Sequence, residues 1–273
     1  MTTTSYLLLK ISEEVRDAVK SSKPVVALES TIYTHGVLYP GSAELPLLLE
    51  SIVRDNGGVP ATIGIVHGQA RVGMETDELH ELATCAINQS ALKASRRDLS
   101  HICGLGIAGK LKYGGTTISG TILLASLAGI RIVGTSGLGG VHKSGETTMD
   151  ISADLTELGR TPIALVSSGC KSFLDIPRTL QYLETEGLHF ANPISVEHAI
   201  SKSDMDDIIN GSLRQAEEAG QMGSENTPYV QARIKERLGR RGLLANEALV
   251  KANVACATKI AVELARIERG ASQ

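Results

Sequence analysis

The sequence contains no tryptophan and only 2 phenylalanines, so bulky aromatic rings cannot dominate its core. Hydrophobic residues still make up 42% of the 273 residues, and 28 residues are glycine. We therefore expect a core of Ala, Val, Ile and Leu with close backbone approaches at glycine, as is typical of helices packed on a sheet. A chain of this length can bury such a core without disulfides. Because no repeat or long linker divides residues 1–273, we predict a single domain.

Cysteine is scarce, and no Cys-x-x-Cys pair occurs among its 4 copies: Cys85, Cys103, Cys170 and Cys256. This spacing argues against a disulfide framework and a thiolate zinc site. A reducing, cytoplasmic compartment fits it, while mitochondrial and peroxisomal locations stay open. A long apolar run is also lacking. The most apolar stretch, residues 121–134, contains Arg131 and is shorter than the ~20 residues that cross a bilayer.

The chain as a whole has no large excess of positive or negative charge. The 27 basic and 30 acidic residues give a net charge of -3, so no overall field attracts nucleic acid or an anionic membrane. The expected partner is a small molecule. Locally, however, no Asp or Glu lies between Asp98 and Glu146. Glycine-rich turns and Thr116-Thr117 at a predicted helix start occur there, and free backbone N–H groups favour an anion such as phosphate. An ordinary basic surface fits this stretch equally well.

Short apolar runs alternate with helical periodicity, which predicts a mixed sheet with helices on its faces. Residues 24–31 are an apolar run ending in polar residues, the pattern of a buried strand whose carboxyl end opens into a site. Further strands are predicted at residues 60–66 and 70–72, as a hairpin, and at 131–135 and 162–167. Helices are predicted from Ser42 and Thr76, which we expect to be caps, from the turn at 114–117, and over residues 150–158. Three charged helices are expected at 205–220, 227–238 and 243–267.

Residues 104–109 match GxGxxG, which raises the alternative of a dinucleotide-binding oxidoreductase. That motif requires a preceding strand and an acidic residue about 20 positions later to hold the ribose. No acidic residue occurs before Glu146, and no GxxxxGK[ST] motif suggests a nucleotide triphosphatase. We therefore expect this segment to be an accidental loop.

Two carboxylates and one lysine occupy positions that suit chemistry. Asp150 and Asp154 lie four residues apart at a predicted helix start, so both can project to one side and offer hard oxygen ligands to Mg²⁺ or Mn²⁺. Taken alone, Asp150 is more often a helix cap. Lys171 follows a predicted strand, where burial and a helix N-terminus would favour the neutral amine. Such an amine can attack a sugar aldehyde and form an imine, although a surface loop lysine is the ordinary interpretation.

Several segments, in order over most of the chain, together resemble the pseudouridine-5'-phosphate glycosidase family, also called pseudouridylate synthase or the indigoidine synthase A family. They are VALESTIYTHGVLYP (25–40), NGGVPATIGIVHGQARVG (56–73), KASRRDL (93–99), GGTTISGT (114–121), residues 137–187 and LLANEALVKANVA (243–255). The resemblance implies a three-layer α/β/α fold with a mixed central sheet. It also implies a homotrimer with one divalent metal per subunit, usually Mn²⁺.

The resemblance further implies a reaction and its residues. Family members reversibly cleave the C–C bond between uracil C5 and ribose C1 in pseudouridine 5'-phosphate, giving uracil and ribose 5-phosphate. The lysine that attacks C1 of the ring-opened sugar matches Lys171, the acid/base glutamate matches Glu29, and the metal aspartate matches Asp150. Substrate contacts match Lys93, Ile118, Ser152, Ala153 and Asp154. We add the hypothesis that Thr117 and His142 join Lys93 around the phosphate. A C–C glycosidic bond has no leaving oxygen to protonate, so a lysine iminium at C1 is a suitable electron sink.

The chain departs from the family pattern at three places. After Gly187, family members continue with several dozen residues that include a strand, before a motif resembling residues 191–194. Loss of that segment raises the alternative of an impaired, truncated member acting as a non-enzymatic subunit. A few residues are added around 104–113. The usual Asn-Asn pair reads Ala252-Asn253, and Asn253 lies on one helix face with Asn246, either for helix-helix hydrogen bonding or pointing inward.

Overall fold

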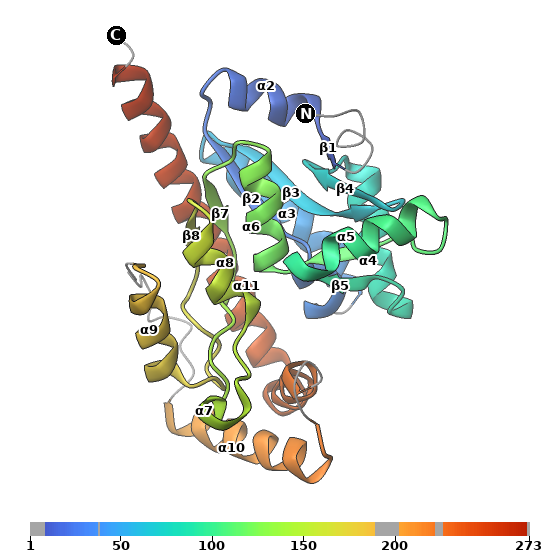
Figure 1. Ribbon diagram of the computed structural model, residues 1–273, viewed down its shortest axis with the longest axis vertical. Helices are drawn as coiled ribbons and strands as arrows, with labels where there is room; N and C mark the ends of the chain where they lie inside the picture. Colours follow the sequence, from blue (N-terminus) through green and yellow to red (C-terminus); the bar gives the residue numbers. More distant parts are fainter. Residues whose placement is uncertain (1–8, 38, 189–201, 222–225, 272–273) are drawn as a thin grey trace.

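The computed structural model describes residues 9–37, 39–188, 202–221 and 226–271, and these form an eight-stranded sheet flanked by helices (Figure 1). Six strands follow one another across the sheet in the order β1 (Leu9–Ile11), β4 (Gln69–Val72), β3 (Val59–Val66), β2 (Val25–Glu29), β7 (Ile132–Gly134) and β8 (Ala164–Val166). A side branch extends from β3 through β6 (Gly114–Thr116) to β5 (Leu92–Ala94). The predicted strands are therefore present, and β2 lies inside the sheet.

The sheet is mixed, as predicted. Strand β3 pairs antiparallel with β4 and with β6, whereas β2 pairs parallel with both β3 and β7, and β7 pairs parallel with β8. Hairpin β3–β4 turns at His67 and Gly68, which both have positive φ. Since β2, β7 and β8 run in the same direction, their carboxyl ends meet at one edge.

Helices cover both faces, which confirms the three-layer architecture. Val25 and Ala27 of β2 face a cluster with α2 (Glu13–Lys20), α5 (Arg96–Ile107), α6 (Ile118–Leu127) and α8 (Ala153–Arg160). Val26 and Leu28 face the opposite cluster, which contains α3 (Gly41–Asp55) and the second half of α11 (Asn226–Ala271). This alternation follows from the period of two along a strand. Helix α4 (Thr76–Asn88) packs against α3.

Several predicted helix starts were wrong by one or more residues. Helix α3 begins at Gly41 after Pro40, and the Ser42 hydroxyl donates to the Ala83 carbonyl instead of capping the helix. Glu75 with Glu78 caps α4 in place of Thr76. Residues 114–116 are a strand because their backbone pairs with β3 and β5, and Thr117 then caps α6. Helix α8 starts at Ala153 with Ser152 as its cap, so Asp150 lies outside the helix.

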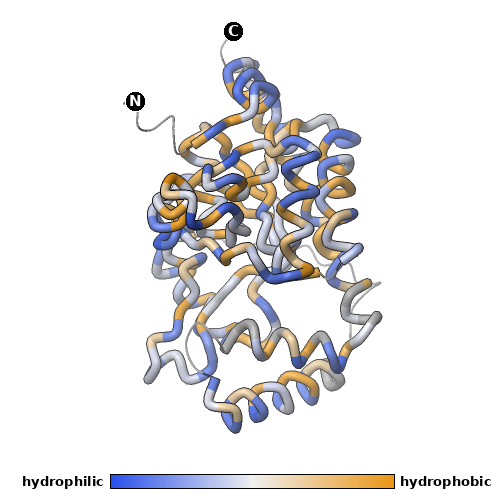
Figure 2. The backbone as a smooth tube through the Cα atoms, turned by 90° about the vertical axis from the view of Figure 1, so that its right-hand side faces the viewer, coloured by the Kyte–Doolittle hydropathy of each residue, from blue (hydrophilic) through white to orange (hydrophobic). Residues whose placement is uncertain are grey.

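Part of the C-terminal helical region forms a small second cluster below the sheet in Figure 1. Helix α10 (Lys202–Glu218) packs against the first part of α11, which changes direction at Gly239, where φ is 53°. In Figure 2, α10 at the bottom alternates hydrophobic and hydrophilic residues, as expected of an amphipathic helix. The three predicted helices are therefore present, two of them as the halves of α11. Among the described helices, none combines the length and the hydropathy that a membrane crossing requires.

Residues 104–107 lie at the end of α5, so the predicted loop was wrong for this part of GxGxxG. No strand immediately precedes the motif, because α5 itself begins at Arg96. This context does not fit a dinucleotide-binding turn. The motif of residues 191–194 lies outside the described residues.

Candidate active site

Glu29 is the last residue of β2, at the edge where the parallel strands end. Its Oε1 accepts a hydrogen bond from the Thr135 hydroxyl, which follows β7, the neighbouring strand. Burial raises the pKa of Glu29 to about 7, and this effect outweighs the Thr135 hydrogen bond and the attraction of Lys171, both of which favour the carboxylate. A carboxyl group with a pKa near neutrality can both accept and donate a proton under physiological conditions.

Lys171 follows β8, and backbone hydrogen bonds hold its loop against the loop after β7. The Lys171 N–H donates to the Leu138 carbonyl at 3.0 Å, and the Leu138 N–H donates to the Gly169 carbonyl at 2.8 Å. A Cβ on Gly137 would lie 3.3 Å from Lys171 Cγ, so glycine at this position leaves room for the lysine stem. Strands β2 and β8, parallel to the β7 strand between them, therefore place Glu29 and Lys171 at one edge, close enough for the lysine charge to lower the pKa of the glutamate.

Lys93 reaches the same region from β5. Its side chain keeps solvent access, yet desolvation by nearby protein atoms lowers the pKa of its ammonium, and repulsion by Lys171 adds to the effect. Glu29 and Asp154 act in the opposite direction. Two lysines and two carboxylates thus influence one another electrostatically. The two that are farthest apart in the sequence, Glu29 and Lys171, are separated by 142 positions.

Asp154 is buried and ties two glycine-containing segments together. Its Oδ1 accepts the Ser119 N–H at 3.0 Å, and its Oδ2 accepts the Gly139 N–H at 3.1 Å. A Cβ on Gly139 would lie 2.1 Å from Ser152 Oγ, so this approach requires glycine. Asp154 therefore positions the loop after β7 against the start of α6, and its charge raises the pKa of Glu29.

The remaining predicted substrate contacts surround the starts of α6 and α8. Thr117 caps α6, and its hydroxyl donates to Ser95 Oγ at 3.3 Å. The Ile118 side chain is 2% exposed and packs in the core, so only its backbone is suited to a polar ligand. Ser152 caps α8 through Asp154 N–H, and Ala153 is the first helical residue. Helix α6 presents its N-terminus beside β5 and β6, an arrangement suited to an anion.

His142 and Asp150 lie on a loop closed by the Val141–Ile151 bridge. The backbone N–H of His142 donates to the backbone carbonyl of Asp150 at 3.0 Å. The ring nitrogen Nδ1 of His142 lies 3.9 Å from Asp150 Oδ2. Burial lowers the pKa of His142, and the positive charges of Lys171 and Lys93 lower it further. The negative charge of Asp150 raises this pKa, but by less than burial lowers it. The predicted helical alignment of Asp150 with Asp154 was wrong, because Asp154 is on α8 and holds two backbone N–H groups.

Among the described residues, no three His, Cys, Asp or Glu side chains gather as a metal-binding group. Asp150 remains partly exposed, with 26% of its side chain accessible. A single carboxylate of this kind fits a water-rich Mg²⁺ or Mn²⁺ site, in which water or substrate oxygens supply the other ligands. It does not fit a closed, all-protein site.

Sequence reasoning missed Thr135, and it left open whether Asn253 points inward. The Asn253 amide on α11 donates to the carbonyls of Thr135 and Ser136, at 2.8 and 3.2 Å, and to Ser168 Oγ at 2.8 Å. It therefore points inward and joins the loops after β7 and β8. The strand order would have been needed to find these contacts, because only the adjacency of β2, β7 and β8 brings the loops together.

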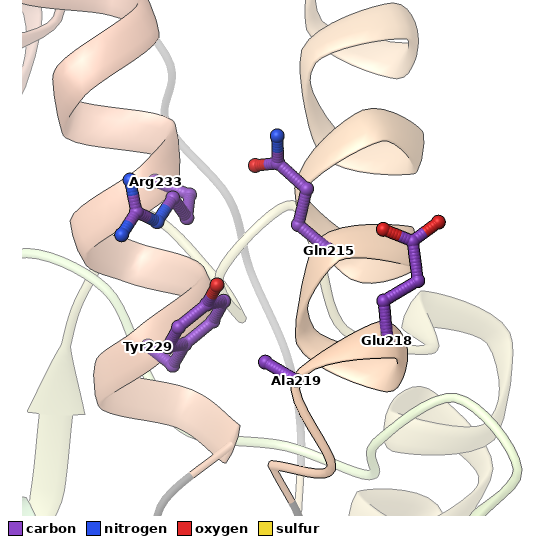
Figure 3. A pocket seen from close by; sticks show the side chains of 5 residues that line it. All are labelled: Gln215, Glu218, Ala219, Tyr229 and Arg233. Carbon is purple, nitrogen blue, oxygen red and sulfur yellow. The ribbon is translucent and has the colours of Figure 1, made fainter.

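A separate cavity of about 420 Å³ lies between α10 and α11, lined by Gln215, Glu218, Ala219, Tyr229 and Arg233 (Figure 3). The Arg233 guanidinium lies 5.2 Å from the centre of the Tyr229 ring, and it also pairs with Glu236 at 2.7 Å. None of these residues belongs to the site at the sheet edge. Because the charged side chains of Glu29, Lys93 and Lys171 gather at that edge, we place the candidate active site there.

Comparison with known proteins gives one family over nearly the whole chain. A sequence model described as "Indigoidine synthase A like protein" matches residues 14–190 and 185–263. Proteins named pseudouridine-5'-phosphate glycosidase from Staphylococcus aureus and pseudouridine-5'-phosphate glycosidase 2 from Rhizobium johnstonii are 36% and 40% identical to the chain. Each alignment covers 95% of this chain and 97% of the relative.

A solved structure is also similar. It is the prealnumycin C-glycosynthase in complex with ribulose 5-phosphate, with 30% identity and a TM-score of 0.85 over 96% of this chain and 99% of that one. The two sequence alignments run over 307 and 308 positions, more than the 273 residues of this chain, so both relatives have residues that face a gap here. The two matched stretches of the family model meet at residues 185–190, where the sequence predicted a missing segment.

Proposed function

Since the chain belongs to the indigoidine synthase A-like family, we propose that it reversibly cleaves the C–C glycosidic bond of pseudouridine 5'-phosphate to give uracil and ribose 5-phosphate. The observation that carries this proposal is the position of Glu29 at the end of β2 and of Lys171 in the loop after β8, where the carboxyl ends of these parallel strands meet at one sheet edge. End-to-end coverage of the relatives argues against the alternative of a truncated, non-enzymatic subunit.

The chemistry follows most simply in the direction of synthesis. The Lys171 amine adds to the aldehyde carbon C1 of open-chain ribose 5-phosphate, and loss of water gives an imine. Uracil C5 then adds to C1 while its proton passes to Glu29, and ring closure through the sugar hydroxyl releases the amine. Cleavage reverses these steps, so Glu29 returns the proton to C5. The pKa of Glu29 near 7 suits both proton transfers.

In this proposal the substrate phosphate binds near Lys93 and the N-terminus of α6. We assign Lys93 as the charged contact, because it keeps solvent access on β5 beside Lys171. Thr117 and His142 join it, and the backbone of Ile118 offers an N–H group at a helix start. Ser152, Ala153 and Asp154 act from the start of α8, with Asp154 holding the Gly139 loop. Remote binding of the phosphate keeps the opened sugar oriented.

We also propose one Mn²⁺ per subunit at Asp150. Its carboxylate is the protein ligand, and the ion would supply electrostatic stabilisation of substrate oxygens when bound. The homotrimer and the cytoplasmic compartment stand as proposals of the same kind, the second supported by four free cysteines.

Uracil release from pseudouridine 5'-phosphate in the presence of Mn²⁺ tests the reaction. We expect release by the wild-type chain and a loss of at least about 10²-fold in Glu29→Gln, because general acid–base catalysis contributes roughly that much. Lys171→Ala should release none above background. Wild-type release no greater than that of Lys171→Ala would refute the proposed activity.

Borohydride trapping tests the nucleophile separately. Reduction in the presence of ribose 5-phosphate should leave a stable adduct on Lys171, located by peptide mass spectrometry. Lys143→Ala is the matched control, because Lys143 lies near His142 in the sequence yet pairs with Asn210 at the surface. An adduct on another lysine, with Lys171 unmodified, would overturn the assignment.

A further inference from the structure

Strands β2 and β6 lie end to end along one edge of β3. Strand β4 pairs with the other edge of β3 at residues 63–66, so β2 and β6 share the remaining one. Glu29, the last residue of β2, pairs with Ile63, and Gly115 of β6 pairs with Gly64, the next residue of β3. Because β2 is parallel to β3 and β6 is antiparallel to it, the carboxyl ends of β2 and β6 meet at this junction.

Both strand ends at the junction lead into the proposed site. Glu29 ends β2 and carries the acid/base carboxyl group. After Thr116, the last residue of β6, the chain passes through the cap Thr117 into α6, whose N-terminus we assign to the substrate phosphate. The way in which the two strand ends are joined therefore determines how far the carboxyl group of Glu29 lies from the bound phosphate.

Ser30, directly after Glu29, forms the connection across the junction. Its Oγ accepts the backbone N–H of Thr116 at 2.9 Å and lies 3.3 Å from the Thr116 hydroxyl oxygen. Its carbonyl accepts the N–H groups of Tyr33 and Thr34, at 3.0 and 3.2 Å, where the chain turns away from the strand. Ser30 thus binds the end of β6 and the turn after β2 at the same time.

The Thr116 hydroxyl is the centre of this connection. It donates to the Ile63 carbonyl at 2.7 Å. Since its only proton is used there, the hydroxyls of Ser30 and Thr121 are the donors to its oxygen, at 3.3 and 2.9 Å. Ser30, Thr116 and Thr121 are fully buried, so water does not compete for these bonds. A buried network in which each hydroxyl has a partner makes the junction rigid.

We propose that Ser30 is a positioning residue for the reaction, because its bonds to Thr116 hold the Glu29 carboxyl group at a fixed place relative to the N-terminus of α6. This inference rests on the proposed function and assigns no chemical step to Ser30. A substrate bound at α6 through its phosphate presents its reacting carbon to Glu29 only when the two strand ends keep their relative position. A misplacement of about 1 Å can lower the rate by ~10²-fold.

Ser30→Ala tests this role, because it removes the acceptor of the Thr116 N–H. We expect kcat for uracil release to fall roughly 10–10²-fold and KM to stay within about threefold of wild type, since the phosphate contacts remain. Borohydride trapping of ribose 5-phosphate on Lys171 should persist, because the proposed imine forms without Glu29. The inflection of the pH profile should also stay in place, because burial, Thr135 and nearby charges set the pKa of Glu29.

Thr121→Val is the matched control. Thr121 is equally buried and loses one hydrogen bond to the same Thr116 oxygen, but it belongs to α6 and does not join the two strand ends. Its kcat should stay close to that of wild type. Ser30→Cys gives a second variant if Ser30→Ala does not fold. Its sulfur is a weak acceptor, so its kcat should lie below that of wild type with KM unchanged.

Three results would overturn the role of Ser30: a wild-type kcat in Ser30→Ala and Ser30→Cys, an equal fall of kcat in Thr121→Val, or loss of trapping on Lys171 together with the fall of kcat. The last two would assign the network to folding alone. Absence of uracil release by the wild-type chain would refute the proposed function and, with it, the role of Ser30.

Discussion

At the residue scale, the protonation of Glu29 is set by opposing neighbours. Burial raises its pKa to about 7, and Asp154 adds to this, whereas Thr135, Lys171 and Lys93 favour the carboxylate. Among these groups, only Thr135 acts through a direct, neutral hydrogen bond. It can therefore be altered without removing a charge from the site.

We predict that Thr135→Val moves the inflection of the pH profile of kcat/KM to higher pH. The Thr135 hydroxyl stabilises the carboxylate, so its loss raises the pKa of Glu29 further above 7. The direction is the same whether the ionised or the protonated form is active. A hydrogen bond to a charged group contributes ~1.5–3 kcal/mol, so we expect a displacement of about one to two pH units.

The control for this measurement is Thr84→Val. The Thr84 hydroxyl donates to the His80 carbonyl of its own helix, and it has no role at Glu29. Its profile should match wild type. An inflection of Thr135→Val that stays in place or moves to lower pH would show that the hydroxyl does not control this carboxyl group.

At the element scale, the GxGxxG segment acquires a packing role. Gly106 at the end of α5 touches the turn of the β3–β4 hairpin, where a Cβ on Gly106 would lie 2.2 Å from Gly68 Cα. Gly104, in the same helix, has no heavy atom within 4 Å of its Cβ position. The motif that suggested nucleotide binding therefore contains one glycine required by backbone contact and one that is not.

These two glycines give opposite predictions for stability. Gly106→Ala should destabilise the protein by about 1–3 kcal/mol, because neighbouring backbone must move to admit the methyl group. Gly104→Ala should stabilise it by ~0.5–1 kcal/mol, because alanine is the better residue within an exposed helix. Urea unfolding of both variants measures these differences. Equal effects of the two substitutions would mean that the hairpin and α5 are not in contact.

Sequence patterns predicted elements better than they predicted contacts. The apolar run of β2 and the β3–β4 hairpin were identifiable because burial and turn chemistry act over a few residues. The strand at residues 114–116 was missed, since its formation depends on pairing with β3 and β5, which are distant in sequence. Thr135 was missed for a similar reason, because its partner Glu29 lies on a neighbouring strand.

At the scale of the whole molecule, the family resemblance predicted which distant residues share a site, and local sequence patterns could not. Glu29 and Lys171 were paired by their family motifs, and the strand order places both at one edge. Local chemistry would have joined Asp150 to Asp154 on one helix, which the start of α8 at Ala153 contradicts. The described residues also contain two distinct regions of packing, the sheet with its helices and the cluster of α10 with the first part of α11.

The second region contacts the site through the residues that follow Lys171. Phe173 and Leu174 are buried in one cluster with Ile209 of α10 and Val230 of α11. This cluster is separate from those on the two faces of the sheet. The loop that carries Lys171 is therefore supported by α10 and α11, so local opening of these helices should affect the nucleophile first.

We predict that Ile209→Ala loosens this region and the Lys171 loop while leaving the sheet intact. Removing the side chain of a residue that is 3% exposed costs about 2–5 kcal/mol. Hydrogen exchange should accelerate in α10, in α11 before Gly239 and in residues 170–174, with β2 and β3 unchanged, and kcat should fall. Val254→Ala is the control, because Val254 packs in the cluster that contains β2. It should accelerate exchange in β2 and β7 as well. If Ile209→Ala has that same effect on β2, the two regions open together and Lys171 depends on the stability of the whole fold.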